Sequence, residues 1–394
     1  MLAAVAARMG YLPYVLAPEE RPPAAAFAAK HVRAEFGDEA ALEAFAKEVD
    51  VVTFEFENVS SAALSRAAAV GLVRPCPEVL YVTQDRSREK RFLARHELPH
   101  VGNRLVSQAD DLAGALREIG TPCVVKTAGF GYDGKGQRLI TAATDVEAIS
   151  AATAMAAQAP VVVERFIDLR VELSVIGART AAGEVSVYAP IVNRHVDHIL
   201  DISVTPAVDD AAQQDTTMGF SLALTSSVVD EARELTIDVM RHLDLVGLCC
   251  VEFFLSSAGE LLINEIAPRP HNSGHLTIEA AATSQFEQQL RTVTGLTLGA
   301  VDLKSAAATA NLLGDLWRPA TADQGLSSAV PPDFARALEV SNVSLHLYGK
   351  TVARPGRKMG HLTALGGSPD EAVERVINAR NALSKARSAV DVAG

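Results

Sequence analysis

Two acidic residues occupy matching positions in a segment that predicts a β-hairpin. Val251–Leu255 and Leu261–Glu265 are strand-like stretches on either side of a turn that contains Gly259. Glu252 and Glu265 are equidistant from the centre of this turn, so we expect them to face each other about 5 Å apart. Facing carboxylates repel unless a cation lies between them, and Mg²⁺ commonly uses one or two carboxylates plus substrate phosphates. The alternative is two exposed acids on opposite faces, which a register error of one residue would produce.

The loop after this hairpin is dense in polar groups. Two prolines constrain the backbone of Ile266–His275, and Arg269, His271, Asn272 and Ser273 follow each other closely within it. A structural loop seldom needs so many hydrogen-bond donors together, so the pattern favours an anion or substrate site.

A glycine-rich turn, Gly129–Gly136, follows the predicted strand Cys123–Lys126. The turn matches the dinucleotide fingerprint as a string and nearly matches the P-loop, but both of these require a helix to follow. Gln137–Ile140 is strand-like instead, so we reject both fingerprints and predict a hairpin. Such a hairpin can fold over a nucleotide and offer backbone N–H groups to its phosphates, with Lys126 adding positive charge. The alternative is a tight surface turn beside a solvated lysine.

The densest basic stretch lies near the C-terminus, at Tyr348–Lys350 and Arg354–His361. Arginine can bind a phosphate through two hydrogen bonds and lysine adds charge, so a phosphate monoester on the substrate would fit. The alternative is a solvated loop that balances nearby acids.

Composition limits the class of protein. The chain has 394 residues and a net charge of −12, which argues against a broad nucleic-acid surface because that requires a basic face. No uninterrupted apolar run approaches the ~18 residues of a membrane span. The four cysteines have neither metal-site nor disulfide-framework spacing, so we expect the reducing cytosol.

The elements that position these residues alternate between helix and strand at first. Within residues 1–97, stretches such as Ala3–Met9 predict helices and Val49–Phe54 predicts a buried strand, which together indicate a parallel, doubly wound sheet. Such a domain normally opens on a strand. Because this chain opens on a helix, we expect Met1 to lie downstream of the first strand and its loop.

Three strings together resemble one known family. Leu262–His275, Gly131–Gln137 and Arg354–His361 are similar to the motifs of 5-(carboxyamino)imidazole ribonucleotide synthase, an ATP-grasp ligase of purine biosynthesis. Phe54–Val59 and Ser284–Glu287 look like further strings of that family. Among four departures from the family pattern, His198 stands where glycine is usual.

The resemblance implies an α/β, ATP-grasp fold with three domains. These would be an N-terminal doubly wound domain at 1–89 without its first strand, an ATP-grasp domain at 90–300 with a lid at about 121–167, and a C-terminal α/β domain at 301–394. It also implies a cytoplasmic homodimer that uses ATP and magnesium, or manganese in its place. ATP would phosphorylate bicarbonate to carboxyphosphate. This species, or carbon dioxide released from it, would carboxylate 5-aminoimidazole ribonucleotide, releasing ADP and phosphate.

The resemblance further implies roles for individual residues. ATP would be bound by Arg86, Lys126, Gly131, Tyr132, Asp133, Gly134, Lys135, Gly136, Gln137, Glu164, Arg165, Phe166, Ile167, Glu172, His195, Asn264 and Glu265. The ribonucleotide would contact Glu55, Tyr132, Asp133, His271, Asn272, Ser273, Lys350 and Arg357. The metal ligands would be Glu252 and Glu265, and the catalytic residues Arg269, Lys358 and Asp133, with Arg269 on the bicarbonate side.

Two other functions remain open at this point. The chain could be another ATP-grasp ligase, such as a formate-dependent purine enzyme or a relative of biotin carboxylase, which would use a different acceptor. It could also be a non-catalytic nucleotide-binding protein, which would bind ATP but no ribonucleotide.

Overall fold

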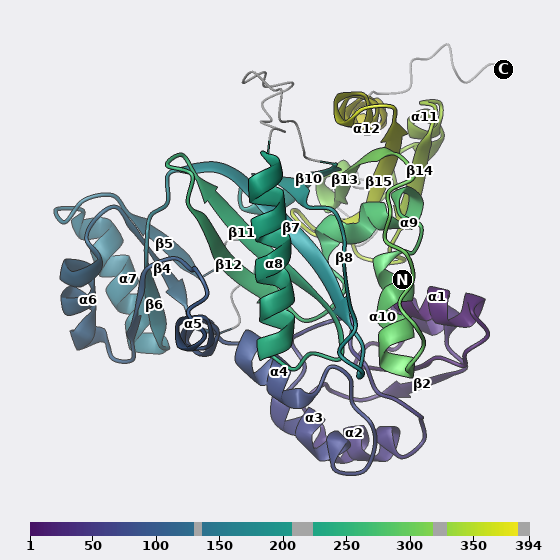
Figure 1. Cartoon of the computed structure of the whole chain (residues 1–394), viewed down its shortest axis with the longest axis horizontal. Coiled ribbons are helices and arrows are strands. Elements are labelled where there is room, and N and C mark those ends of the chain that lie inside the picture. Colours follow the sequence, from purple (N-terminus) through teal and green to yellow (C-terminus); the bar gives the residue numbers. More distant parts are fainter. Residues whose placement is uncertain (130–135, 207–223, 318–328, 385–394) are drawn as a thin grey trace.

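The computed structural model describes residues 1–129, 136–206, 224–317 and 329–384, and within these residues the strands form three sheets (Figure 1). They are a two-stranded parallel sheet, a four-stranded antiparallel sheet and a nine-stranded antiparallel sheet. No helix of the described residues combines the length and the apolar character that a bilayer crossing requires.

The N-terminal part holds the small parallel sheet and several short helices. Its elements are α1 (Leu2–Arg8), β1 (Tyr14–Ala17), β2 (Lys30–Arg33), α2 (Glu39–Ala46), α3 (Ser61–Ala68) and α4 (Pro77–Thr83). The predicted N-terminal helix is confirmed, but the predicted strand over Val49–Phe54 is wrong, because only Val52 pairs, with Val73. Val52 and Phe54 are buried. An apolar run indicates burial without indicating a strand ladder, which explains the error.

The four-stranded sheet carries the glycine-rich turn. Its strands, in spatial order, are β3 (Asn103–Val106), β6 (Val161–Arg165), β4 (Cys123–Thr127) and β5 (Gln137–Ile140). Helices α6 (Leu112–Ile119) and α7 (Val146–Gln158) pack against them. Strands β4 and β5 pair antiparallel from Cys123 opposite Ile140 to Lys126 opposite Gln137. The predicted hairpin is therefore confirmed, although residues 130–135 lie outside the described part of the chain.

The nine-stranded sheet is the largest layer of the molecule. Its spatial order is β12, β11, β7, β9, β10, β13, β15, β14, with β8 beside β7. The strands are β7 (Leu169–Arg179), β8 (Val185–Val187), β9 (Ile191–Val196), β10 (Ile199–Thr205), β11 (Gly247–Ser256), β12 (Leu261–Ala267), β13 (Ala306–Leu313), β14 (Val343–Leu347) and β15 (Lys358–Gly366). Strands on both sides of residue 300 thus belong to one sheet.

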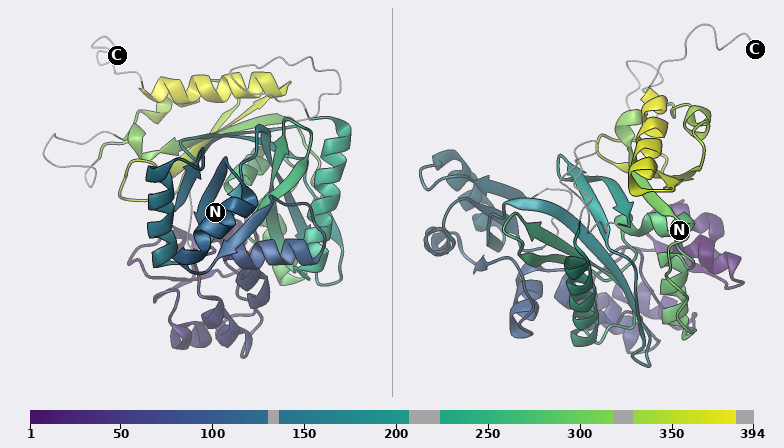
Figure 2. Two further views of the ribbon diagram at one scale, coloured as in Figure 1. Left: turned by 90° about the vertical axis from the view of Figure 1, so that its left-hand side faces the viewer. Right: turned by 45° about the horizontal axis from the view of Figure 1, so that its top comes forward.

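Helices cover this sheet and close its core. They are α5 (Arg86–Arg95), α8 (Ser226–His242), α9 (Thr277–Ala280), α10 (Gln285–Thr294), α11 (Phe334–Leu338) and α12 (Pro369–Ser384). Val239 of α8 and Val376 of α12 join Leu173 and Phe253 of the sheet in one apolar cluster. Figure 2 shows α12 lying along the C-terminal strands. The layers leave Glu252 and Phe254 of β11, with Asn264 and Glu265 of β12, lining a shared cavity.

Candidate functional site

The β11–β12 hairpin brings Glu252 and Glu265 opposite each other, as predicted. Close to the turn, however, the strands are one residue out of the predicted register, since Phe253 faces Ile263. If that register continued, Asn264 would face Glu252. The register shifts between Glu252 and Phe253, which makes Asn264 the extra residue of a β-bulge on β12. The bulge restores the pairing of the two carboxylates.

Both carboxylates have cationic or hydrogen-bonding neighbours. Glu252 Oε1 lies 2.9 Å from His271 Nε2, and Glu265 Oε2 lies 3.2 Å from Arg86 Nη1. Burial alone would raise the pKa of Glu252, but His271, then His195 and Lys358, hold that pKa well below its usual range. Glu252 is therefore an anion at neutral pH.

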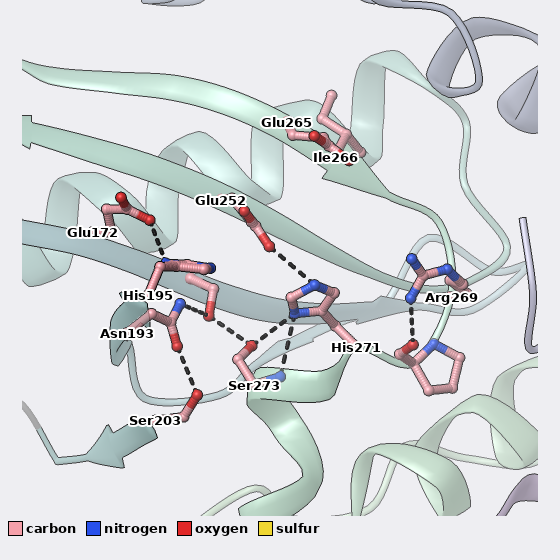
Figure 3. Close-up of polar contacts among 12 residues, drawn as sticks. Glu172, Asn193, His195, Ser203, Glu252, Glu265, Ile266, Arg269, His271 and Ser273 are labelled. Atoms are coloured by element: carbon pink, nitrogen blue, oxygen red, sulfur yellow. Dashed lines mark hydrogen bonds and ion pairs between the residues drawn. The ribbon is translucent and has the colours of Figure 1, made fainter. Parts of the chain in front are cut away.

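A buried chain of hydrogen bonds fixes His271 from behind (Figure 3). Ser203 Oγ donates to Asn193 Oδ1 at 2.8 Å, and Asn193 Nδ2 donates to Ser174 Oγ at 3.0 Å. Ser174 Oγ then donates to Ser273 Oγ at 2.8 Å. Ser273 approaches His271 Nδ1 with its hydroxyl at 2.9 Å and its backbone N–H at 3.3 Å. Because a backbone N–H can only donate, Nδ1 is the acceptor.

It follows that a neutral His271 carries its proton on Nε2, the nitrogen that faces Glu252. The imidazole then donates to the carboxylate and orients it. Such hydrogen bonds to a metal-binding group from behind tune its position and basicity.

The two facing carboxylates fit a magnesium ion bound together with a nucleotide. Among the described residues, no group of three or more His, Cys, Asp or Glu side chains forms a metal site made of protein alone. Magnesium seldom needs one, because it retains waters and phosphate oxygens as ligands. Asn264 Oδ1 adds a buried oxygen with no hydrogen-bond partner beside Glu265. Its chemistry suits a third contact to the cation.

Buried charges connect α5 with strands β4 and β6. Glu164 on β6 is 2% exposed and lies 2.5 Å from Lys126 Nζ and 3.5 Å from Lys90 Nζ. Burial alone would raise the pKa of Glu164, but Lys126, Lys90 and Arg86 lower it to about 2. The Lys126 ammonium group is thereby held at the cavity.

A second acid–base pair lies on strands β7 and β9. His195 Nδ1 is 2.6 Å from Glu172 Oε2, and both side chains are partly exposed to the cavity. Burial disfavours the imidazolium, but Glu172 outweighs this effect and raises the pKa of His195. The two residues predicted to contact ATP from this side therefore lie together.

The N-terminal part contributes to the same cavity. Glu57 accepts two hydrogen bonds from Arg269, at 2.7 Å from Nη2 and 3.0 Å from Nε. This bidentate pair orients the guanidinium group that we predicted on the bicarbonate side. Glu55 accepts from the Met1 amine at 3.1 Å and the Leu2 N–H at 3.3 Å.

The basic C-terminal residues Lys350, Arg357 and Lys358 line the same cavity. Lys350 Nζ donates to the backbone oxygen of Lys358 at 2.6 Å, and Arg357 Nη1 donates to the backbone oxygen of Val352 at 2.6 Å. Both cationic groups are therefore in reach of the cavity while they rest on backbone carbonyls.

One cavity of about 2100 Å³ collects most of the predicted site residues. The residues that line it are Glu55, Arg86, Lys126, Gly136, Gln137, Glu164, Arg165, Phe166, Ile167, Glu172, His195, Glu252, Asn264, Glu265, Arg269, His271, Asn272, Lys350, Arg357 and Lys358. Ser273 is fully buried behind His271 and does not line it. The predicted residues Gly131, Tyr132, Asp133, Gly134 and Lys135 lie outside the described part of the chain.

Sequence reasoning did not single out Glu57, Glu89 or Lys90. Glu89 and Lys90 are only 1% and 2% exposed although both are ionisable. Burial raises the pKa of Glu89 to about 8. The available signal was spacing, because Arg86, Glu89 and Lys90 stand at i, i+3 and i+4 and therefore share one face of α5.

The fold and the site together define the class of protein. A small antiparallel sheet carries the β4–β5 hairpin, a larger antiparallel sheet carries two opposed carboxylates, and the ATP-grasp domain model matches residues 91–286. The ribonucleotide synthetase preATP-grasp domain matches residues 1–84, and the phosphoribosylaminoimidazole carboxylase C-terminal domain matches residues 307–375. The expected fold class is confirmed, and the chain is an ATP-grasp ligase.

The chain belongs to the N5-carboxyaminoimidazole ribonucleotide synthase family, which confirms the predicted resemblance. It is 38% identical to the synthase of Brucella melitensis over 93% of this chain and 92% of that protein. The Bacillus subtilis synthase is 34% identical over 96% and 91%. A crystal structure of the synthetase with ADP superposes with a TM-score of 0.84 at 32% identity, covering 96% of this chain and 92% of that one. The Aspergillus clavatus synthase with ADP and 5-aminoimidazole ribonucleotide gives 0.82 at 26% identity, covering 97% and 95%.

Proposed function

We propose that this chain catalyses the ATP-dependent carboxylation of 5-aminoimidazole ribonucleotide by bicarbonate, a step of purine biosynthesis. A bicarbonate oxygen attacks the γ-phosphorus of ATP and displaces ADP. The exocyclic amine of the ribonucleotide then forms a bond to the carboxyl carbon, or to carbon dioxide released from it, and phosphate leaves. The observation that carries this proposal is that the opposed carboxylates, the buried lysine–glutamate cluster and the basic C-terminal residues line one cavity.

The chain's own residues divide the work by position. Lys126 and Arg86 are the cations available to ATP phosphates, and Glu172 with His195 lies ready for the ribose hydroxyls. Glu164, Arg165, Phe166 and Ile167 would offer strand backbone to the base. Phosphoryl transfer depends mainly on such positioning and on charge neutralisation.

The ribonucleotide and bicarbonate would occupy the other end of the cavity. Lys350 and Arg357 are proposed for the ribonucleotide phosphate, and Glu55, His271 and Asn272 for the rest of that ligand. Arg269, oriented by Glu57, would bind bicarbonate and the carboxyphosphate formed from it. Ser273 is proposed to act through His271, because it is buried behind that ring. Lys358 and the undescribed residue Asp133 remain the proposed catalytic partners.

Glu252, Glu265 and Asn264 would hold Mg²⁺, or Mn²⁺ in its place. When bound, this cation would neutralise charge on the transferred phosphoryl group. Glu252 is kept anionic by its neighbours, which suits it to this role.

Three further proposals concern the domain division, the oligomeric state and the location of the protein. The domain division at 1–89, 90–300 and 301–394 is supported by the three domain matches, and the lid at about 121–167 by a four-stranded sheet separate from the nine-stranded one. A homodimer is carried over from the family. A cytosolic location is supported by the four cysteines, none of which forms a disulfide.

The direct assay is phosphate release from ATP in the presence of Mg²⁺ and bicarbonate. Adding 5-aminoimidazole ribonucleotide should raise the rate by at least about 10²-fold, because the acceptor completes the reacting geometry. When formate replaces bicarbonate, or biotin replaces 5-aminoimidazole ribonucleotide, the rate of phosphate release should stay at background. Release that responds to formate or biotin but not to the ribonucleotide would assign the chain to another ATP-grasp ligase. ATP binding with no release under any condition would leave a non-catalytic nucleotide-binding protein.

A further inference from the structure

Strand β12, which carries Glu265, is an edge strand of the nine-stranded sheet. The outer side of an edge strand presents backbone N–H and C=O groups that no neighbouring strand satisfies. On β12 the N–H of Ile263 is satisfied by the backbone oxygen of Pro99 at 2.9 Å. Beyond Ile263 the bulge begins, and no strand of the described residues pairs with β12 on this outer side.

Two adjacent side chains of α5 bind the backbone on either side of Glu265. Lys90 Nζ donates to the backbone oxygen of Asn264 at 2.8 Å. Glu89 Oε2 accepts from the backbone N–H of Ile266, also at 2.8 Å. These contacts reach the bulge residue and the residue immediately after the carboxylate.

The burial of these two side chains shows that the contacts are not incidental surface hydrogen bonds. Lys90 and Glu89 are 2% and 1% exposed, and burying ionisable groups is costly unless they are bonded. Glu265 itself is bound by Arg86, one turn earlier on the same face of α5. One helix therefore contacts both the carboxylate and the two peptide groups that flank it.

We propose that Glu89 and Lys90 are positioning residues that hold the β12 bulge in place and so keep Glu265 opposite Glu252. Without the bulge, the register at the turn would place Asn264 opposite Glu252. We call the two contacts of Glu89 and Lys90 with the β12 backbone the α5 clamp. The clamp therefore determines whether β12 places Glu265 or Asn264 opposite Glu252. This inference rests on the proposed metal role of the two carboxylates.

The clamp also couples the metal strand to the lid. Lys90 reaches Glu164 on β6, which binds Lys126 on β4. The backbone N–H of Arg86 donates to the backbone oxygen of Ala128, at the base of the glycine hairpin, at 2.7 Å. Helix α5 thus contacts the residue that follows β4, the strand of Lys126, and also contacts β12, the strand of Glu265.

The decisive experiment compares Glu89→Met with Glu89→Gln. Methionine has a similar length but no acceptor for the Ile266 N–H, whereas glutamine keeps a carbonyl oxygen there. Mn²⁺ binding in the presence of ADP, followed by electron paramagnetic resonance, should weaken about 10-fold or more in Glu89→Met, since partners behind a ligand carry effects of that size. Glu89→Gln should stay close to the wild type.

Leu93→Ala serves as the control for lost stability alone. Leu93 is fully buried on the same helix and touches neither β12 peptide through a hydrogen bond. This variant should unfold at a lower temperature and keep its Mn²⁺ affinity. If Leu93→Ala lost as much Mn²⁺ affinity as Glu89→Met, the stability of the protein, and not the clamp, would determine the Mn²⁺ affinity.

Amide exchange separates the clamp from the metal role and needs no variant that might misfold. In the wild type without metal, the Ile266 amide should exchange as slowly as the Ile263 amide, because both are hydrogen-bonded and buried. Rapid exchange at Ile266 alone would overturn the clamp. A second outcome is possible: the Ile266 amide is protected, but Glu265→Gln binds Mn²⁺ as well as the wild type does. In that case the proposed metal role of Glu265 is wrong, and the clamp only stabilises the fold.

Discussion

At the scale of single residues, the site depends on charges that are buried and paired. Glu164 lies between the ammonium groups of Lys126 and Lys90, and its side chain is 2% exposed. Removing one member of a buried charge cluster leaves the charges of its partners uncompensated. The resulting loss in the free energy of unfolding exceeds the net contribution of the intact cluster.

Glu164→Gln should therefore destabilise the protein by about 3 kcal/mol or more at pH 7. The folded pKa of Glu164, about 2, lies below its ordinary value of 4.5, so this stabilisation is complete above about pH 4.5 and is lost as the pH falls towards 2. Urea unfolding at pH 7 and pH 3.5 should show a smaller difference between variant and wild type at the lower pH.

Glu260→Gln provides the matched control for this prediction. Glu260 pairs with Arg165 at the surface, where both side chains are about half exposed. Exposed pairs contribute little, so this variant should unfold close to the wild type at both pH values. An equal loss for Glu164→Gln and Glu260→Gln would contradict the account of the buried cluster.

The same scale shows what sequence reasoning could and could not find. The opposition of Glu252 and Glu265 followed from their symmetry about the turn, yet it holds only because a bulge at Asn264 shifts the register. No local sequence pattern predicts that bulge. Its causes, Glu89 and Lys90, lie more than 170 positions away in the chain and become visible only in three dimensions.

At the scale of elements, turns were predictable where glycine stands and harder where it is absent. Val196 pairs with Ile199, so Asp197 and His198 form a two-residue turn between β9 and β10. Both have positive φ, 49° and 64°. Such turns favour glycine, and the predicted departure at His198 thus falls on a strained position.

His198→Gly should stabilise the protein by about 1 kcal/mol, because a left-handed conformation costs a side-chain-bearing residue about that much. The exposed contact between His198 and Gln137, at 3.1 Å, would be lost and should offset little of the gain. Thermal unfolding measures the difference. Asp197→Gly should raise the stability less, since aspartate tolerates this conformation better. A melting temperature of His198→Gly below that of the wild type would refute the explanation.

Connections between elements were the least predictable feature. Helices such as α5 and the hairpin β11–β12 followed from periodicity, but the apolar run at Val49–Phe54 formed no strand. The joining of β13, β14 and β15 to the sheet of β7–β12 also had no sequence signal. Long-range pairing depends on the packing of both faces and not on the local pattern.

At the scale of the whole molecule, three regions of the chain meet at one cavity. Arg269 of the central part is oriented by Glu57 of the N-terminal part, and Lys358 of the C-terminal part lines the same space. The proposed bicarbonate and ribonucleotide sites would surround the nucleotide and shield a labile intermediate from water. The central claim is therefore that bicarbonate, and not water, receives the phosphoryl group.

Oxygen transfer from labelled bicarbonate tests this claim most directly. The chain would be incubated with ATP, Mg²⁺, 5-aminoimidazole ribonucleotide and ¹⁸O-labelled bicarbonate, and the released phosphate analysed by mass spectrometry before label exchanges with water. Our account predicts one ¹⁸O atom in each phosphate, whether carboxyphosphate or carbon dioxide reacts with the amine. Phosphate that carries oxygen from water alone would contradict it.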